Sequence, residues 1–147
     1  ILSRQNLPFV QRTKEQISSI QKGGYLLSHE EDADITLVAS GSEVQLILAA
    51  AKSIQNDGFK VNIASIPCLD KFYTQDQAYR DSVVDPDIPK LVVEALHPDS
   101  WQGLINLNDT IIGMKTFGES APANELMIKF GFTEENIVTE AKKLLKK

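Results

Sequence analysis

The sequence predicts an α/β protein built as a three-layer α/β/α sandwich. Its mostly parallel sheet of about five strands is expected to carry one antiparallel edge strand. Short apolar runs, typical of strands buried on both faces of a sheet, occur at four places: 35–39, 60–66, 90–95 and 110–114. Stretches with helical spacing or helix-end residues lie between them. Strands that alternate with helices favour a parallel sheet covered on both sides.

The first part of the chain has weaker signals. Residues 1–22 are mixed in character and mostly polar after residue 12, so we interpret them as a surface linker. A glycine turn at 22–24 leads into the short apolar run 25–27. No crossover helix separates this run from the strand at 35–39. We therefore expect 25–27 to be the antiparallel edge strand.

A strand–helix–strand unit follows. After the strand at 35–39, Val44, Ile47 and Ala51 recur at helical spacing, and Gly58 marks the helix end. The strand at 60–66 completes the unit. Such a crossover makes its two strands parallel, with a right-handed connection.

The second half continues the alternation. Helices are expected at 75–84, at 101–107 between the third and fourth of the apolar strands, and at 122–130. Thr133 is placed to cap a final helix whose first turn is acidic and whose last turn carries lysines, which suits the helix dipole.

Composition excludes several classes of function. Of 147 residues, 42% are hydrophobic and 24% charged, as in soluble globular domains. The net charge of −5 and the scattered lysines argue against nucleic-acid binding, and no apolar run approaches the ~20 residues that span a bilayer. The single cysteine, Cys68, excludes an internal disulfide and fits a reducing compartment. It lies far from His29 and His97, so no metal-ligand spacing is visible.

Two groups of residues are candidate sites at strand ends. Ser40-Gly41-Ser42 leads from a strand into a helix, where open α/β sheets bind ligands and free helix amides hold anions. A tight turn at Gly41 and a helix cap at Ser42 also explain these residues, and Glu43 would repel a phosphate. We favour this structural interpretation and keep the anion site as an alternative.

Glu94 ends the third apolar strand and is followed by His97 and Asp99, which together are a candidate acid–base cluster. The alternative, which we favour, is that Glu94 hydrogen-bonds the backbone of a neighbouring loop or lies at an interface. Trp101 beside the same strand end is expected to fill the core or an interface.

The start of the chain is also informative. Ile1-Leu2 reads as the end of a strand that begins elsewhere, and no methionine precedes it, so we expect a piece of a longer protein. Arg4 follows in an otherwise uncharged stretch. Its guanidinium is suited to clamp a phosphate or carboxylate, but from the residue taken alone we favour a surface ion pair.

Several stretches, in order along the chain, resemble transketolases, the last two in their bacterial form: 2–8, 22–25, 39–44, 79–83, 113–123 and 130–133. The resemblance implies that 1–22 is the tail of a pyrimidine-binding domain with a linker, and that 23–147 is a transketolase C-terminal domain. Residues 95–109 depart from the family pattern, which leaves His97 and Asp99 without an implied role.

What the resemblance implies is a cytoplasmic enzyme of the pentose phosphate pathway that moves a two-carbon ketol unit between sugar phosphates. Such enzymes are homodimers that use thiamine diphosphate with Mg²⁺ or Ca²⁺, bound by upstream domains. Arg4 occupies the position that contacts the phosphate of the substrate, and the C-terminal domain serves mainly dimer packing. This chain alone is therefore expected to be inactive. The alternatives are a freestanding regulatory module that binds an anion at 40–43, and a sister enzyme such as dihydroxyacetone synthase.

Overall fold

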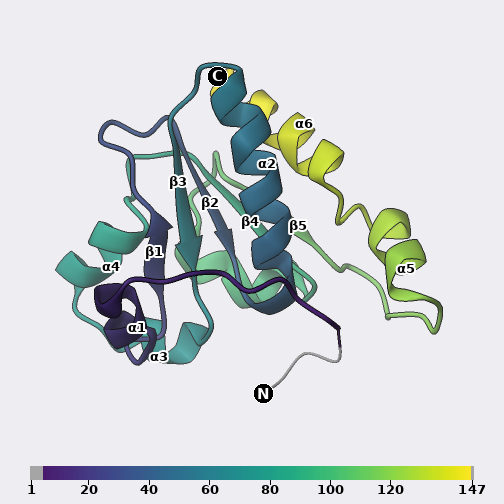
Figure 1. The fold of residues 1–147 in the computed structure, drawn as a ribbon, viewed down its shortest axis with the longest axis horizontal. Helices are drawn as coiled ribbons and strands as arrows, with labels where there is room; N and C mark the ends of the chain where they lie inside the picture. The colour runs from purple at the N-terminus through teal and green to yellow at the C-terminus, as the bar shows by residue number, and fades with distance from the viewer. Residues whose placement is uncertain (1–4, 147) are drawn as a thin grey trace.

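The computed structural model describes residues 5–146 (Figure 1). The elements are α1 (Lys14–Ile20), β1 (Tyr25–Ser28), β2 (Ile35–Ala39), the 3₁₀ helix η1 (Gly41–Glu43), α2 (Val44–Asn56), β3 (Val61–Ser65), α3 (Leu69–Tyr73), α4 (Gln77–Val83), β4 (Lys90–Glu94), the 3₁₀ helix η2 (Pro98–Leu104), β5 (Thr110–Gly113), α5 (Ala123–Lys129) and α6 (Glu134–Leu145).

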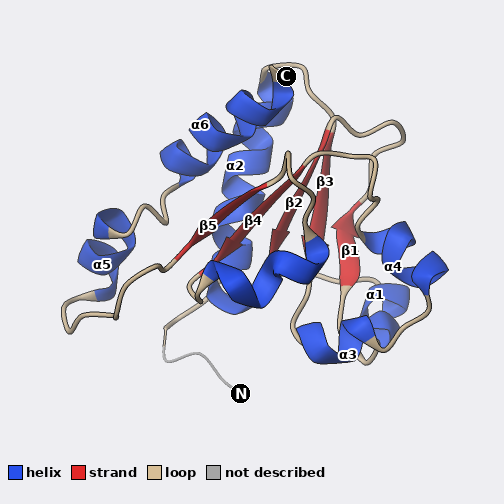
Figure 2. Ribbon diagram, turned by 180° about the vertical axis from the view of Figure 1, so that it is seen from behind, coloured by secondary structure: helices blue, strands red, loops and turns tan. Residues whose placement is uncertain are grey.

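The five strands form one sheet in the order β1-β3-β2-β4-β5 (Figure 2). β1 runs antiparallel to β3, and every other pair is parallel, which confirms the predicted mixed sheet and its edge strand. Every residue of β2, β3 and β4 is buried, because helices cover both faces of these strands.

Alternate residues of each strand face different helical layers. Leu37 and Leu91 belong to the core cluster under α2 and α6, whereas their neighbours Val38 and Val92 belong to the cluster under α3, α4 and η2. Figures 1 and 2 show α2 and α6 together on one side of the sheet, and α3, α4 and η2 pack on the opposite side. Trp101 is buried in the second cluster, which confirms its predicted place in the core.

Three helices differ from the prediction. The linker expected before residue 22 contains α1, which is capped by Thr13 and Gln16 but buries none of its residues, so it has no apolar periodicity to detect. The helix expected at 75–84 is the shorter α4, which Asp76 caps, and α3 precedes it as a helix that the prediction did not contain. The helix expected at 101–107 is η2, which begins earlier, at Pro98.

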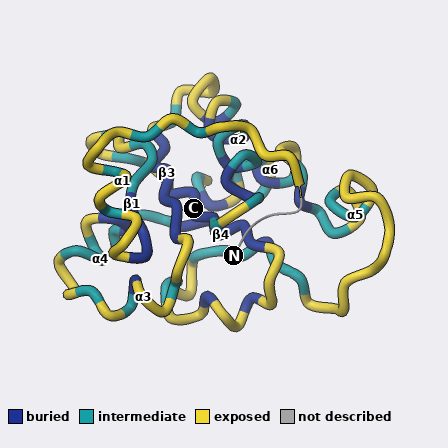
Figure 3. The backbone as a smooth tube through the Cα atoms, turned by 60° about the horizontal axis from the view of Figure 1, so that its bottom comes forward, coloured by how far each residue is buried: buried dark blue, intermediate teal, exposed yellow. Residues whose placement is uncertain are grey.

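The part of the chain around α5 stands apart from the layers. α5 buries no residue, and the loop that leads to it is exposed along most of its length (Figures 1 and 3). Phe117 in this loop and Ile128 on α5 are 97% and 70% exposed. This end of the sheet therefore presents apolar side chains to its surroundings.

Candidate functional site

The candidate site lies at the carboxyl edge of the sheet, where β2 and β4 end side by side. Their parallel register pairs Ala39 with Val93, so the next residues, Ser40 and Glu94, are neighbours. The Ser40 hydroxyl donates a 2.5 Å hydrogen bond to Oε2 of Glu94. Glu94 thus bonds the loop that follows the adjacent strand, as the structural interpretation expected.

A second carboxyl group lies close to this pair. Gly41 adopts a left-handed φ of 51°, and the turn that it allows brings Glu43 into a buried position in η1. The Ser42 hydroxyl donates a 2.8 Å hydrogen bond to Oε1 of Glu43. Two acidic side chains, each with a serine partner, are therefore buried at one edge of the sheet.

Burial changes the protonation of both acids. It raises the pKa of Glu94 to about 7; the hydrogen bond from Ser40 opposes this rise, and the negative charge of Glu43 adds to it. Burial also raises the pKa of Glu43, against the effect of the hydrogen bond from Ser42. Close to neutral pH, part of the Glu94 carboxyl groups therefore hold a proton that an ordinary surface glutamate would have released.

This charge distribution bears on the anion site considered at residues 40–43. An anion placed at the turn would meet the carboxyl groups of Glu43 and Glu94, and ionisation of either would repel it. Both side chains are also buried, so neither reaches a substrate as an acid or base in this arrangement. The geometry supports a structural and proton-holding role for this edge.

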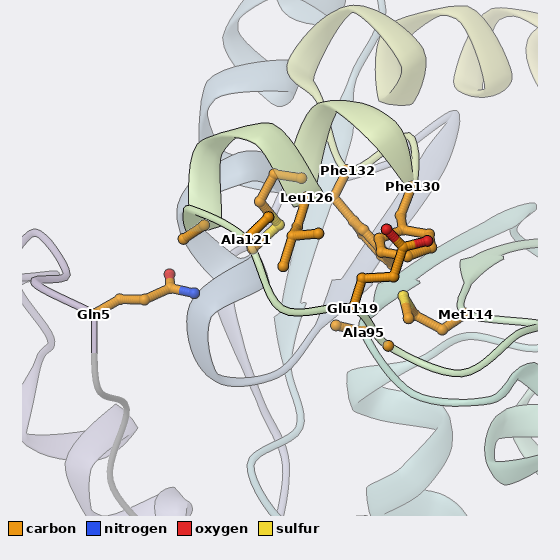
Figure 4. Close-up of a pocket in the computed structure, with 11 residues that line it drawn as sticks. Gln5, Ala95, Met114, Glu119, Ala121, Leu126, Phe130 and Phe132 are labelled. Carbon is orange, nitrogen blue, oxygen red and sulfur yellow. The ribbon is translucent and has the colours of Figure 1, made fainter.

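A cavity of about 520 Å³ opens beside the same edge. It lies between Ala95, the loop after β5 and α5, and Met114, Leu126 and Phe130 line much of it (Figure 4). Lys129 holds the loop to α5 through both carboxylate oxygens of Glu119. The walls of the cavity are therefore mainly apolar, and the Lys129–Glu119 ion pair connects the loop to α5.

The N-terminal segment reaches the mouth of this cavity. Gln5 lines it and points its side chain toward the loop and α5 (Figure 4). Gln5 and residues of the 113–123 stretch, which are distant in the sequence, therefore line one cavity at the carboxyl edge of the sheet. Arg4, the predicted substrate contact, lies outside the described residues.

The other predicted site residues do not join this cluster. His97 is exposed, and its Nδ1 lies 3.4 Å from Oδ2 of Asp99. Among residues 5–146, no hydrogen bond or ion pair links either residue to Glu94, so the structure does not assemble the acid–base cluster. Cys68 is exposed at the start of α3.

Sequence reasoning missed a buried ion pair. Lys90 Nζ lies 3.2 Å from Asp109 Oδ2, and the two side chains are 1% and 3% exposed. The same ammonium group donates to the carbonyl oxygens of Asp85, Pro86 and Ile88. A lysine at the first position of an apolar strand was the available signal. The pair binds the amino ends of β4 and β5 together.

Within the part of the chain that the structure describes, no group of three or more His, Cys, Asp or Glu side chains is placed to hold a metal ion. None of the helices described there is both long and apolar enough to cross a membrane. The buried acids at the carboxyl edge come as a pair and lack a third ligand.

These features define a class of protein: a three-layer α/β domain with a mixed five-stranded sheet and a buried serine–glutamate hydrogen bond at its carboxyl edge. Residues 23–133 match the family model described as the transketolase-like TK C-terminal domain. The chain belongs to this family, as the resemblance of its motifs implied.

The sequences of individual relatives align with almost the whole chain. It is 46% identical to transketolase 1 of Vibrio parahaemolyticus and 45% identical to transketolase 1 of Escherichia coli, each over 99% of the chain and 22% of the relative. Among solved structures, transketolase of Pichia stipitis in complex with sedoheptulose-7-phosphate is 34% identical, with a TM-score of 0.87 over 97% of this chain and 20% of that one. Transketolase from Leishmania mexicana has a TM-score of 0.82 at 35% identity, over 88% and 19%. The chain thus spans about a fifth of the length of the relatives it matches.

Proposed function

We propose that this chain serves as the C-terminal domain of a transketolase, which moves a two-carbon ketol unit from a ketose phosphate to an aldose phosphate. The observation that carries the proposal is the match to bacterial transketolases over 99% of the chain but only 22% of their length. The full enzyme would be a cytoplasmic homodimer that uses thiamine diphosphate with Mg²⁺ or Ca²⁺.

The chain by itself would not catalyse this reaction. A diphosphate cofactor with its metal needs several oxygen ligands and anion-binding groups. The described residues do not fit this need, because no set of metal-binding side chains occurs among them and the strand-end turn is flanked by two buried acids. In the proposal, other parts of the enzyme bind the cofactor, and this domain packs against them and contributes to the dimer.

Arg4 is the residue of this chain proposed to touch substrate, through the phosphate group of the sugar. The position of Gln5 supports this assignment, since Gln5 follows Arg4 in the sequence and lies at the carboxyl edge of the sheet, where α/β domains bind ligands. A solved relative from Pichia stipitis is a complex with xylulose-5-phosphate. The alternative of a freestanding anion-binding module gains no support from the acidic turn at 40–43.

A domain exchange tests the proposal. The chain would replace the matching C-terminal part of the Escherichia coli transketolase 1, its 45% identical relative. We expect a dimer with ketol transfer that depends on thiamine diphosphate in a coupled assay, whereas the 147-residue chain alone gives no turnover. A chimera that folds and dimerises but lacks transfer, or turnover by the chain alone, would contradict the proposal. The unmodified Escherichia coli enzyme is the control.

A further inference from the structure

A second cavity, of about 210 Å³, lies in the other helical layer, between α3, α4 and η2. Tyr73 at the end of α3 and Arg80 on α4 line it from one side, and Gly103 of η2 lines it from the other. Its volume is below that of pockets which enclose drug-sized ligands. A ligand here must be compact.

Two hydrogen-bond donors in this cavity have no partner. The phenol oxygen of Tyr73 and Nε of Arg80 are both buried, and neither makes a hydrogen bond in the structure. Buried polar groups are nearly always satisfied, so an orphaned donor calls for a group that completes it. Two such donors lining one small cavity indicate a single acceptor between them.

The charge in the cavity favours an anion. Burial raises the pKa of the Tyr73 phenol, and the nearby guanidinium of Arg80 acts against this rise, which shows that its positive charge is felt at the phenol. Another guanidinium nitrogen of Arg80 donates to Oε1 of Gln77. Among the residues that the structure describes, Arg80 forms no ion pair with a carboxylate. Its guanidinium therefore makes no ion pair there, and its own Nε and the Tyr73 hydroxyl both lack an acceptor.

Glycine at position 103 lets η2 pack closely against the phenol of Tyr73. A Cβ atom there would lie 2.9 Å from the Tyr73 hydroxyl oxygen, closer than ordinary contact allows. Any other residue would therefore fill the cavity or displace the phenol. The opposing influence is Asp81, which also lines the cavity and accepts a hydrogen bond from Gln77.

We propose that this cavity binds a compact oxyanion, with Arg80 Nε and the Tyr73 hydroxyl as its two donors. Arginine is suited to this task, because its guanidinium holds phosphate or carboxylate oxygens in a fixed geometry. Asp81 weakens the binding by repulsion and keeps the site from being saturated by ordinary anions. The proposal does not depend on the proposed function, since the site lies apart from the carboxyl edge of the sheet.

Isothermal titration of the 147-residue chain with inorganic phosphate tests the site at constant ionic strength. We expect saturable binding of one phosphate per chain. Arg80→Gln should weaken it about tenfold or more, and Tyr73→Phe about fivefold. Asp81→Asn should strengthen it, and Gly103→Ala should weaken it without changing the charge. Lys52→Gln on α2, exposed and in the opposite layer, removes the same charge and should have no effect.

Parallel titrations with malonate and with fructose 6-phosphate identify the source of the oxyanion. Binding of phosphate alone assigns a free phosphate site. Binding of either other ligand, with the same loss in Arg80→Gln, supports the oxyanion site and names its class. Absence of saturable binding by all three overturns the proposal, as does binding that Arg80→Gln and Tyr73→Phe leave unchanged.

A stability measurement separates a ligand role for Tyr73 from a structural one. The Tyr79 hydroxyl donates a 2.8 Å hydrogen bond to the carbonyl of Gly24, whereas the Tyr73 hydroxyl has no partner. Without phosphate, Tyr79→Phe should lower the melting temperature, and Tyr73→Phe should leave it unchanged or raise it. With phosphate, wild type should gain more than Tyr73→Phe. A Tyr73→Phe loss as large as that of Tyr79→Phe, with or without phosphate, would overturn the ligand role.

Discussion

The hydroxyl of Ser40 donates a 2.5 Å hydrogen bond to the carboxyl group of Glu94 and so joins the ends of the two central strands, β2 and β4. The acceptor is an acid that the fold buries almost completely, next to a second buried acid, Glu43. A bond of this kind holds the carboxyl edge together, and it also ties the stability of the domain to pH.

Replacing Glu94 with glutamine should remove part of this pH dependence. The folded pKa of Glu94, about 7, lies above its ordinary value of 4.5. Its contribution to stability is therefore fully present below about pH 4.5 and is lost as the pH rises through about 7. Glu94→Gln should be more stable than wild type at pH 8, by on the order of 2–3 kcal/mol, and the difference should shrink toward pH 5. Urea unfolding at both values measures it.

Two further variants check the origin of this effect. Ser40→Ala removes a hydrogen bond that favours the ionised form, so it should move the midpoint of the pH dependence upward. Glu125→Gln, on the exposed surface of α5, should leave the dependence as in wild type. A Glu94→Gln profile parallel to that of wild type between pH 5 and pH 8 would show that Glu94 is already ionised in the fold.

The buried pair Lys90–Asp109 should be sensitive to loss of one partner. Lys90→Met leaves the Asp109 carboxylate buried without its cation and deprives three carbonyl oxygens of a donor. We expect a loss of about 3–5 kcal/mol in the free energy of unfolding, measured with urea at pH 7. The surface pair Lys143–Glu140, with side chains 63% and 26% exposed, is the matched comparison, and Lys143→Met should cost less than about 1 kcal/mol. Similar losses in the two variants would argue against a special role for the buried pair.

Gly23 should tolerate no side chain. Its φ is 92°, and a Cβ atom would lie 2.4 Å from the backbone nitrogen of Phe72 and 2.5 Å from the carbonyl oxygen of Cys68. Gly58 has the same φ but open space around it. Gly23→Ala should therefore lower the melting temperature well beyond Gly58→Ala, whose cost of about 1–2 kcal/mol reflects backbone strain alone. Equal shifts would mean that the loop moves aside.

Arg4→Ala, made in the domain-exchanged transketolase, tests the substrate contact. Loss of a charged contact to phosphate should lower kcat/KM by the equivalent of roughly 1.5–3 kcal/mol. The effect should fall on phosphorylated substrates and spare unphosphorylated ones such as hydroxypyruvate. The measurement is steady-state kinetics with both kinds of substrate. Equal losses with both would remove Arg4 from the phosphate-binding role.

The strands were predictable because their signals are local and strong. β2 and β4 are continuous apolar runs, and the absence of a helix between β1 and β2 predicted the antiparallel edge. α1 and α3 were not predicted: α1 buries no residue, and α3 buries only Phe72. Helices that contribute little to the core lack the periodicity by which sequence reasoning detects them.

The site residues also differ in how much of their arrangement the sequence predicted. Ser40 and Glu94 stood out as polar residues at strand ends, but their hydrogen bond and the raised pKa of Glu94 arise only when β2 and β4 align. Tyr73 and Arg80 belong to different helices, and nothing local in the sequence indicates that they line one cavity. The pairing of Lys90 with Asp109 likewise spans 19 positions.

The sequence by itself determined the α/β class, the parallel core of the sheet, its antiparallel edge and the transketolase family, because apolar periodicity and ordered motifs are properties of the chain. Only the tertiary structure decided which polar groups lose their water, which acids have a raised pKa and which donors are left without acceptors. These properties depend on distances between elements far apart in the chain, and burial converts those distances into altered pKa values and unsatisfied hydrogen bonds.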